Sequence, residues 1–178
     1  MSVLADRLLA VHEALDTAGL PHAFGGAIAL AFCTYEPRGT QDLDINVFVP
    51  RTDADQALAV LPAGVTVTRA NRRQLAKDAQ ARVWWDTTPL DLFFNNHPFH
   101  EFAAERVRIV EFAGTTIPVL DCTSLAVFKA FFNRTKDWAD LEEMFAAGQL
   151  DVVVVRALLV DLIDEPDPRI VRLDALTR

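Results

Sequence analysis

Residues 25–30 read GGAIAL and residues 38–49 read RGTQDLDINVFV, and these two segments decide the fold. Over residues 43–49 apolar and polar side chains alternate, which is typical of a β-strand, and Pro50 ends the pattern. The apolar run over residues 27–32 predicts a buried helix that begins directly after the two glycines. We therefore expect a glycine step, a short helix and an acid-bearing strand, in this order.

Asp42 and Asp44 lie two residues apart on this strand or just before it. The period-2 geometry of a strand puts both carboxylates on one face, where two like charges are costly unless a positive charge lies between them. Two hard oxygen ligands in this arrangement suit Mg²⁺. Acids on a solvated strand face would give the same pattern, so the interpretation depends on what else the chain offers.

Two further features favour a site over a solvated face. Asp91 lies in the middle of the apolar stretch PLDLFF, residues 89–94, where an acid is expensive to bury without a partner. Leu90 and Leu92 would face the core, and Asp91 would face the other side. Glycines let backbone amides approach a phosphate, and a helix N-terminus adds partial positive charge, although two glycines also fit a tight turn. Three acids beside such a step predict a nucleotide–metal site.

The rest of the chain predicts a mixed α/β core over residues 1–120 and a helical tail over residues 121–178, packed together as one unit. Expected helices are 2–18, 53–61, 123–132, 136–147, 151–163 and 167–176. Expected extended segments are 22–24, 65–68, 82–86, 90–94, 107–112 and 116–120. Residues 71–80 fit either a helix or a loop.

Composition excludes several classes of protein. A chain of 178 residues with 51% hydrophobic and 24% charged residues is typical of one globular domain and not of a disordered protein. Its 17 Lys and Arg against 25 Asp and Glu give a net charge of −8, which disfavours a general DNA-binding protein or a polybasic membrane binder. Without a signal-peptide pattern or a long apolar run, we expect a soluble cytoplasmic protein with no membrane partner.

Several other residues receive structural interpretations. Cys33 and Cys122 lie in apolar runs without metal-binding spacing and are expected to be reduced, buried thiols. His97 and His100 flank a Pro-Phe turn and are expected on the surface. Trp84-Trp85 fits core and rim better than a base-stacking pocket. A basic cluster forms either a solvated face or a docking site for an RNA backbone: Arg69, Arg72, Arg73, Lys77 and Arg82.

Three features occur together in this chain: Gly25-Gly26, the pattern Arg38-x-Thr40-x-Asp42-x-Asp44, and the apolar-flanked Asp91. In this combination the chain resembles the nucleotidyltransferase (polymerase-β-like) superfamily, and most of all its small AbiEii-like, toxin-type members. Residues 123–129 (TSLAVFK) and 134–141 (RTKDWADL) are similar to the helical region of those families. The resemblance spans roughly residues 5–145 and implies a mixed twisted β-sheet flanked by helices, with a C-terminal helical tail.

The resemblance also implies roles for individual residues. Gly25 and Gly26 would hold the triphosphate through backbone amides. Asp42, Asp44 and Asp91 would bind Mg²⁺, and Asp91 would also help to deprotonate the attacking hydroxyl. Nucleotide contacts are expected from Arg38, Thr40, Lys129, Lys136 and Asp140, with Lys129 also counted among the catalytic residues.

The residues themselves leave some of these roles open. Arg38 could instead pair with Asp42 or Glu36. Lys136, Asp137 and Asp140 have the spacing of ion pairs on a helix surface or between helices.

The implied activity is a Mg²⁺-dependent, or Mn²⁺-dependent, transfer of a nucleoside monophosphate from a nucleoside triphosphate to a hydroxyl. The acceptor would be an RNA or tRNA end or a protein, as in a toxin that has a cognate antitoxin protein. Two alternatives remain. One is an aminoglycoside-type nucleotidyltransferase, because an acidic surface suits a polycationic substrate. The other is a non-catalytic module that binds a nucleotide or a partner.

Overall fold

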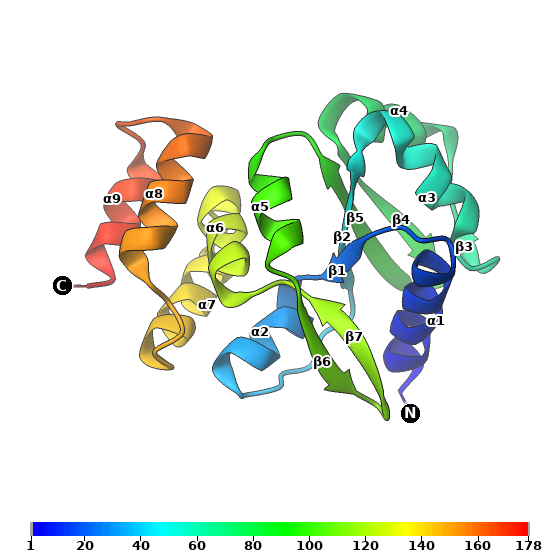
Figure 1. The fold of residues 1–178 in the computed structure, drawn as a ribbon, viewed down its shortest axis with the longest axis horizontal. Helices are drawn as coiled ribbons and strands as arrows, with labels where there is room; N and C mark the ends of the chain where they lie inside the picture. Colours follow the sequence, from blue (N-terminus) through cyan, green and yellow to red (C-terminus); the bar gives the residue numbers. More distant parts are fainter. Residues whose placement is uncertain (1, 178) are drawn as a thin grey trace.

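The computed structural model describes residues 2–177, and within them the chain forms one mixed β-sheet with helices around it (Figure 1). The strands are β1 (His22–Phe24), β2 (Leu43–Pro50), β3 (Val65–Thr66), β4 (Gln80–Trp85), β5 (Thr88–Asn95), β6 (Arg108–Phe112) and β7 (Thr115–Val119). Their order across the sheet is β3-β4-β5-β2-β1-β7-β6. β2 runs parallel to β5 and β1 runs parallel to β7, whereas the other neighbouring strands are antiparallel.

The helices are α1 (Val3–Thr17), α2 (Gly26–Thr34), α3 (Ala54–Val60), α4 (Arg69–Asp78), α5 (Phe99–Glu105), α6 (Cys122–Phe132), α7 (Thr135–Ala146), α8 (Val152–Ile163) and α9 (Pro168–Ala175), with a 3₁₀ turn at Arg51–Asp53. Figure 1 shows α8 and α9 at one end of the molecule and α1, α3 and α4 at the other. The predicted mixed sheet with flanking helices and a C-terminal helical tail is confirmed. The division at residue 120 stays a prediction. Among residues 2–177, none of the helices is both long enough and apolar enough to cross a membrane.

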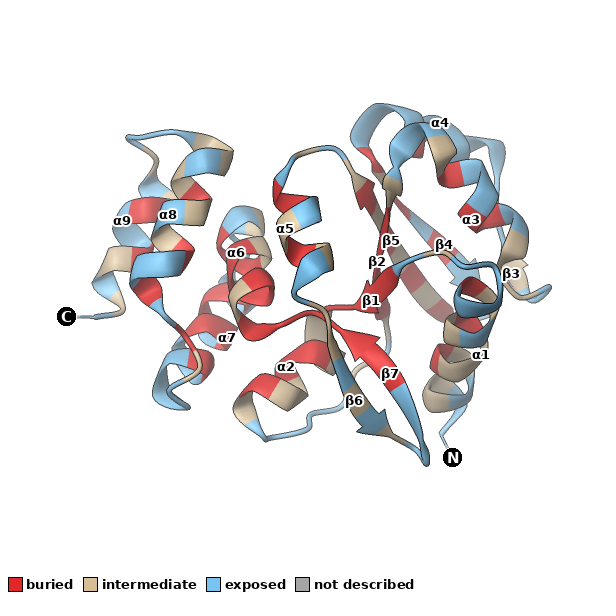
Figure 2. Ribbon diagram, in the orientation of Figure 1, coloured by how far each residue is buried: buried red, intermediate tan, exposed pale blue. Residues whose placement is uncertain are grey.

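The apolar face of the two central strands forms the middle of the core. Leu43 and Ile45 of β2 lie opposite Leu90 and Leu92 of β5, and all four side chains are at most 1% exposed. Figure 2 shows the central strands largely in the colour of buried residues. Because side chains alternate along a strand, the residues between these four point to the opposite face, as expected for Asp91.

Residues 71–78, within the segment that the sequence allows to be a helix or a loop, belong to a helix with a hydrogen-bonded N-terminal cap. Thr68 Oγ1 accepts a hydrogen bond from the Asn71 amide (3.2 Å), and Asn71 Oδ1 accepts one from the Thr68 amide (2.8 Å). This reciprocal capping box satisfies two amides that would otherwise have no partner in the first turn. The segment is therefore a helix, α4, and it begins before the expected residue 71.

Helix α5 is not predicted from the sequence, and it corrects one expectation. His97 and His100 were both expected on the surface, but His100 is 8% exposed. Pro98 precedes the helix, where its fixed φ angle favours a helical start. The ring of Phe99 then packs edge-on against Phe128 of α6, with centroids 5.0 Å apart. This packing buries His100, and burial lowers the pKa of its imidazole because it disfavours the charged form.

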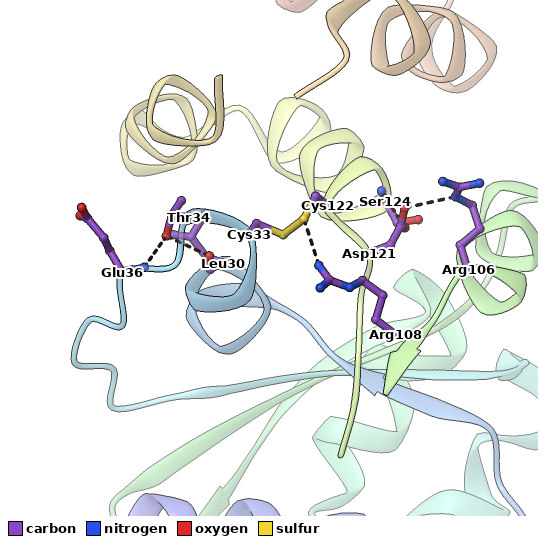
Figure 3. Close-up of a disulfide and its surroundings, with 9 residues drawn as sticks. All are labelled: Leu30, Cys33, Thr34, Glu36, Arg106, Arg108, Asp121, Cys122 and Ser124. Atoms are coloured by element: carbon purple, nitrogen blue, oxygen red, sulfur yellow. Dashed lines mark hydrogen bonds and ion pairs between the residues drawn. A yellow bond between two sulfur atoms is a disulfide. The ribbon is translucent and has the colours of Figure 1, made fainter. Parts of the chain in front are cut away.

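The two cysteines form a disulfide, so the prediction of reduced thiols is wrong. Cys33 in the last turn of α2 is bonded to Cys122, the first residue of α6, and their Cα atoms are 5.7 Å apart (Figure 3). Arg108 lies beside the bond and donates to Cys122 Sγ at 3.5 Å. The two positions are 89 residues apart in sequence, and only the packing of α2 against α6 brings them together. The disulfide thus fixes one helix relative to the other.

We expect reduction of this disulfide to lower the free energy of unfolding by about 4 kcal/mol, because it frees a loop of 89 residues in the unfolded chain. Urea unfolding of the oxidised and reduced protein, with thiols counted in each sample, measures the difference. A Cys33→Ala/Cys122→Ala variant is the control and should not respond to reductant. Equal midpoints for the oxidised and reduced wild-type protein would contradict the prediction.

Candidate active site

A row of three charged side chains crosses the centre of the sheet on the face opposite the core. The strand register places Asp44 of β2 beside Asp91 of β5, and Asp91 beside Arg82 of β4. Arg82 donates from Nε to Asp91 Oδ1 at 2.7 Å and from Nη2 to Asp91 Oδ2 at 2.6 Å. This bidentate pair raises the pKa of the Arg82 guanidinium. Asp91 thus faces the site as predicted, but a guanidinium holds both of its oxygens.

The next row along the same strands is uncharged. It consists of Asn46 of β2, Phe93 of β5 and Gln80 of β4, again side by side in register. Phe93 packs against Phe132 of α6 with ring centroids 5.6 Å apart. The floor of the site therefore changes from charged to apolar within two residues along β5.

The glycine step lies directly against Asp44. The Gly25 amide donates to the Asp44 carbonyl at 2.8 Å, which joins the end of β1 to β2. Gly26 has a φ of +51°, and a Cβ atom there would lie 1.8 Å from Asp44 Oδ2. Only glycine fits this position, because any side chain would displace the carboxylate. Helix α2 begins at Gly26, so its first amides, which have no partner within the helix, lie next to Asp44.

Asp44 carries an unfavourable charge in this setting. Burial, together with the nearby carboxylates of Asp42 and Asp91, raises its pKa from 3.8 to about 6, although Lys129 and Lys136 oppose the shift. A bound cation between the carboxylates would remove this penalty. The electrostatics therefore favour cation binding at Asp44.

Asp42 is held by a local hydrogen bond at the start of β2. Its Oδ1 accepts a hydrogen bond from Thr40 Oγ1 at 2.5 Å, which orients the carboxylate. Thr40 therefore acts on the site through Asp42.

Helices α6 and α7 supply a wall of paired charges. The buried Lys129 donates from Nζ to Asp140 Oδ2 at 2.5 Å. Asp140 also accepts from Arg38, so Arg38 pairs with neither Asp42 nor Glu36. In the same wall, Arg134 holds the buried Asp137, with Nε 2.7 Å from Oδ2. Lys136 is exposed. Asp137 and Asp140 therefore make ion pairs, one of the two roles left open for them.

Two adjoining recesses are lined by five of the ten predicted site residues. The first, here called the glycine recess, is lined by Gly25, Gly26, Asp44, Lys129 and Arg134, among others. The second, the acid recess, has a volume of about 250 Å³ and is lined by Asp44, Arg82, Asp91 and Arg134, among others. Asp140 lies behind Lys129, and Thr40 acts through Asp42. Arg38, Asp42 and Lys136 do not line either recess.

The donor set fits a cation held by two carboxylates. Asp42 is close enough to raise the pKa of Asp44, as such a site requires. Across residues 2–177, however, no group of three Asp, Glu, His or Cys side chains is placed to hold a metal ion. Arg82 occupies both oxygens of Asp91, so Asp91 could act as a third ligand only if that pair opened.

Two residues that line the recesses, Arg82 and Arg134, are not predicted as site residues from the sequence. Arg82 was assigned only to the basic cluster, and Arg134 only to a helical motif. The signal for Arg82 was present, since alternation along β4 puts Gln80, Arg82 and Trp84 on one face. The sequence does not predict that β5 pairs with β4, and it is this pairing that places Arg82 beside Asp91. Trp84 and Trp85 line neither recess.

We expect Asp44→Asn to stabilise the metal-free protein at high pH. Because the folded-state pKa lies at about 6 and the ordinary value is 3.8, the wild-type protein loses stability as the pH rises through this interval. The variant should match the wild type near pH 4 and exceed it by up to about 3 kcal/mol at pH 8. Urea unfolding in EDTA at both pH values measures this, with Asp161→Asn on α8 as the exposed control. A pH-independent difference would contradict the raised pKa.

The pair of Lys129 and Asp140 gives a second stability prediction. Asp140→Ala removes the hydrogen-bonded partner of a buried ammonium, leaving only Asp137 at 3.9 Å, and should cost about 3–5 kcal/mol. The double variant Lys129→Met/Asp140→Leu should cost less, because it removes both charges. Asp55→Ala is the control, since Asp55 pairs with Arg72 at the surface and such pairs contribute at most about 1 kcal/mol. Chemical unfolding that gives equal losses for Asp140→Ala and Asp55→Ala would contradict this account.

Comparison with known proteins yields similarity in structure only. No family model matches the chain, and no curated protein matches its sequence. The solution structure of the antibiotic-resistance factor ANT(2'')-Ia superposes with a TM-score of 0.62 at 14% identity, covering 89% of this chain and 90% of that one. The crystal structure of ANT(2'')-Ia in complex with adenylyl-2''-tobramycin gives 0.62 at 15% identity, with 89% and 97% covered. JHP933 from Helicobacter pylori gives 0.51 at 16% identity, with 99% and 91% covered.

These identities are low, so the likeness concerns the fold. It extends over nearly the whole of both chains in each comparison. The resemblance to nucleotidyltransferases is thereby confirmed for the architecture, while the assignment to the AbiEii-like branch stays a prediction. The chain has the nucleotidyltransferase fold.

Proposed function

We propose that this protein is a metal-dependent nucleotidyltransferase that transfers a nucleoside monophosphate from a nucleoside triphosphate to a hydroxyl group. The observation that carries the proposal is the packing of the Asp44 carboxylate against Gly26 at the start of α2. A phosphate site and a cation site then share one boundary, as the triphosphate of a metal–nucleotide complex requires.

On the donor side, the residues of the glycine recess bind the triphosphate. The first amides of α2 would donate to phosphate oxygens, helped by the partial positive charge of the helix end. Lys129 and Arg134 line the same recess and add positive charge. A divalent cation held by Asp42 and Asp44, Mg²⁺ or Mn²⁺, would neutralise charge on the phosphate oxygens when bound.

On the acceptor side, Asp91 has the position of a general base. The hydroxyl oxygen attacks the α-phosphorus, the bond to the oxygen that bridges to the β-phosphorus breaks, and pyrophosphate leaves with that electron pair. The hydroxyl proton passes to the Asp91 carboxylate. Before this step the ion pair between Asp91 and Arg82 must open. The guanidinium of Arg82 is then available to bind a phosphate of either substrate.

An RNA end is the acceptor that the charges support best. Helix α4 borders the acid recess, since Asn71 donates to the Arg82 carbonyl at 2.7 Å and Gln74 lines the recess. The same helix carries exposed Arg73 and Lys77, which can attract an RNA backbone. With such an acceptor the protein would work in the cytoplasm and would fit a toxin with an antitoxin partner.

An aminoglycoside-type acceptor finds less support, although ANT(2'')-Ia shares the fold. A polycation needs carboxylates that are free of protein cations. Around this site Asp91, Asp137 and Asp140 are all paired with protein cations. Only Asp42 and Asp44 remain for other partners, and the metal would take these two.

Label transfer tests the proposal. Folded protein, Mg²⁺ and each α-labelled nucleoside triphosphate are incubated with total RNA, with tobramycin and with cell extract. We expect label on RNA, lowered at least about 100-fold by Asp44→Asn because the cation and the phosphates lose their shared ligand. Asp161→Asn on α8 should transfer label like the wild type.

The other outcomes separate the alternatives. Label on tobramycin alone would establish the aminoglycoside-type activity, and label on protein would establish a protein acceptor. Tight binding of Mg²⁺–ATP without transfer to any of the three would indicate a binding module. Absence of both binding and transfer would contradict the proposal.

A further inference from the structure

A cavity of about 410 Å³, here called the aromatic pocket, lies beside the acid recess. Its phenylalanine lining comes from β5, α5 and α6 and consists of Phe93, Phe94, Phe99, Phe128, Phe131 and Phe132. These rings also contact one another, for example Phe131 and Phe132 at 5.7 Å between centroids. The volume falls within the roughly 300–1,000 Å³ of small-molecule sites. Such walls suit a flat ring that stacks on aromatic faces.

The pocket is continuous with the candidate active site. Phe93 and Phe132 line the aromatic pocket and both recesses, and Gln80 lines the pocket and the acid recess. Phe93 follows Asp91 by two residues and therefore lies on the same face of β5. A ring bound in the pocket would thus begin next to the carboxylate that takes the acceptor's proton.

The order of the strands assigns the pocket to the acceptor. β1 leads into the glycine step, β2 follows with Asp44, and β5 and β4 lie beyond it. The strands contribute Phe93 and Phe94 of β5 and Gln80 of β4 to the pocket, and both strands lie on the side of β2 away from β1. In an in-line displacement the attacking oxygen lies across the phosphorus from the leaving pyrophosphate. With the triphosphate at the glycine step, the acceptor enters from the side of the pocket.

The polar groups around the pocket suit a nucleobase. Gln80 and Asn96 offer amide donors and acceptors at the lining, and such groups pair with the edges of unstacked bases. Asp78 is the one carboxylate in that lining among residues 2–177, so a polycation finds little there. In the adjoining acid recess, Arg82 can face the phosphate of the same nucleotide.

We propose that the aromatic pocket binds the terminal nucleobase of a single-stranded RNA acceptor and thereby brings the ribose hydroxyl of that nucleotide to Asp91. The inference rests on the proposed function and adds to it a place for the acceptor's base.

The test uses an RNA trinucleotide whose 3′-terminal base is 2-aminopurine, a base that loses fluorescence when it stacks. We expect the full-length protein to lower its fluorescence. The Leu162→Trp side chain should fill the pocket from α8. We expect it to lower the affinity for the trinucleotide at least about tenfold, because stacking of a base contributes roughly 1–3 kcal/mol. Calorimetric binding of Mg²⁺–ATP should stay unchanged in this variant. Phe145→Ala, exposed on α7, is the matched control and should change neither reading.

Three results would overturn the inference. The first is equal probe affinity in the wild type and Leu162→Trp while Mg²⁺–ATP still binds. The second is displacement of the probe by ATP alone, which would show that the pocket binds the base of the nucleoside triphosphate. The third is a stronger effect of Leu162→Trp on N-acetyltyrosinamide than on the trinucleotide, which would indicate a protein acceptor. Failure of the proposed function differs from all three, because the wild type would then neither bind Mg²⁺–ATP nor transfer label.

Discussion

The close approach of the Asp44 carboxylate to the start of α2 is the constraint on which the site depends. It requires glycine at position 26, since a Cβ atom there would lie 1.8 Å from Asp44 Oδ2. It also places a half-buried acid beside two others, and the pKa of Asp44 is raised to about 6. The fold tolerates this cost because the same arrangement puts helix amides and carboxylates within reach of one metal–nucleotide complex.

Ion pairs between different elements hold the walls around this point. Asp140 of α7 binds both Lys129 of α6 and Arg38 from the segment before β2, so three parts of the chain meet at one carboxylate. The disulfide joins α2 to the start of α6. The glycine step and the cationic wall are therefore fixed relative to each other. Because these ion pairs leave few carboxylates free at the site, the site is poorly suited to a polycation, although the chain as a whole is acidic.

The sequence predicts those features that depend on local periodicity. Alternation places Asp91 opposite Leu90 and Leu92, and the glycine pair marks the start of a helix. It does not predict features that depend on which strands and helices become neighbours. The pairing of Arg82 with Asp91, the disulfide and the burial of His100 all arise from contacts between segments distant in sequence. The sequence thus predicts which face of a strand a residue occupies, but not which distant residue it contacts.

The most direct test of the central claim is a crystal structure of the protein with Mg²⁺ and a non-hydrolysable ATP analogue. We expect the triphosphate at the first amides of α2, next to Gly26, and the cation between the carboxylates of Asp42 and Asp44. We also expect an empty aromatic pocket, because the acceptor is absent from this complex. A nucleotide bound away from the glycine step, or a cation that avoids Asp44, would contradict the account.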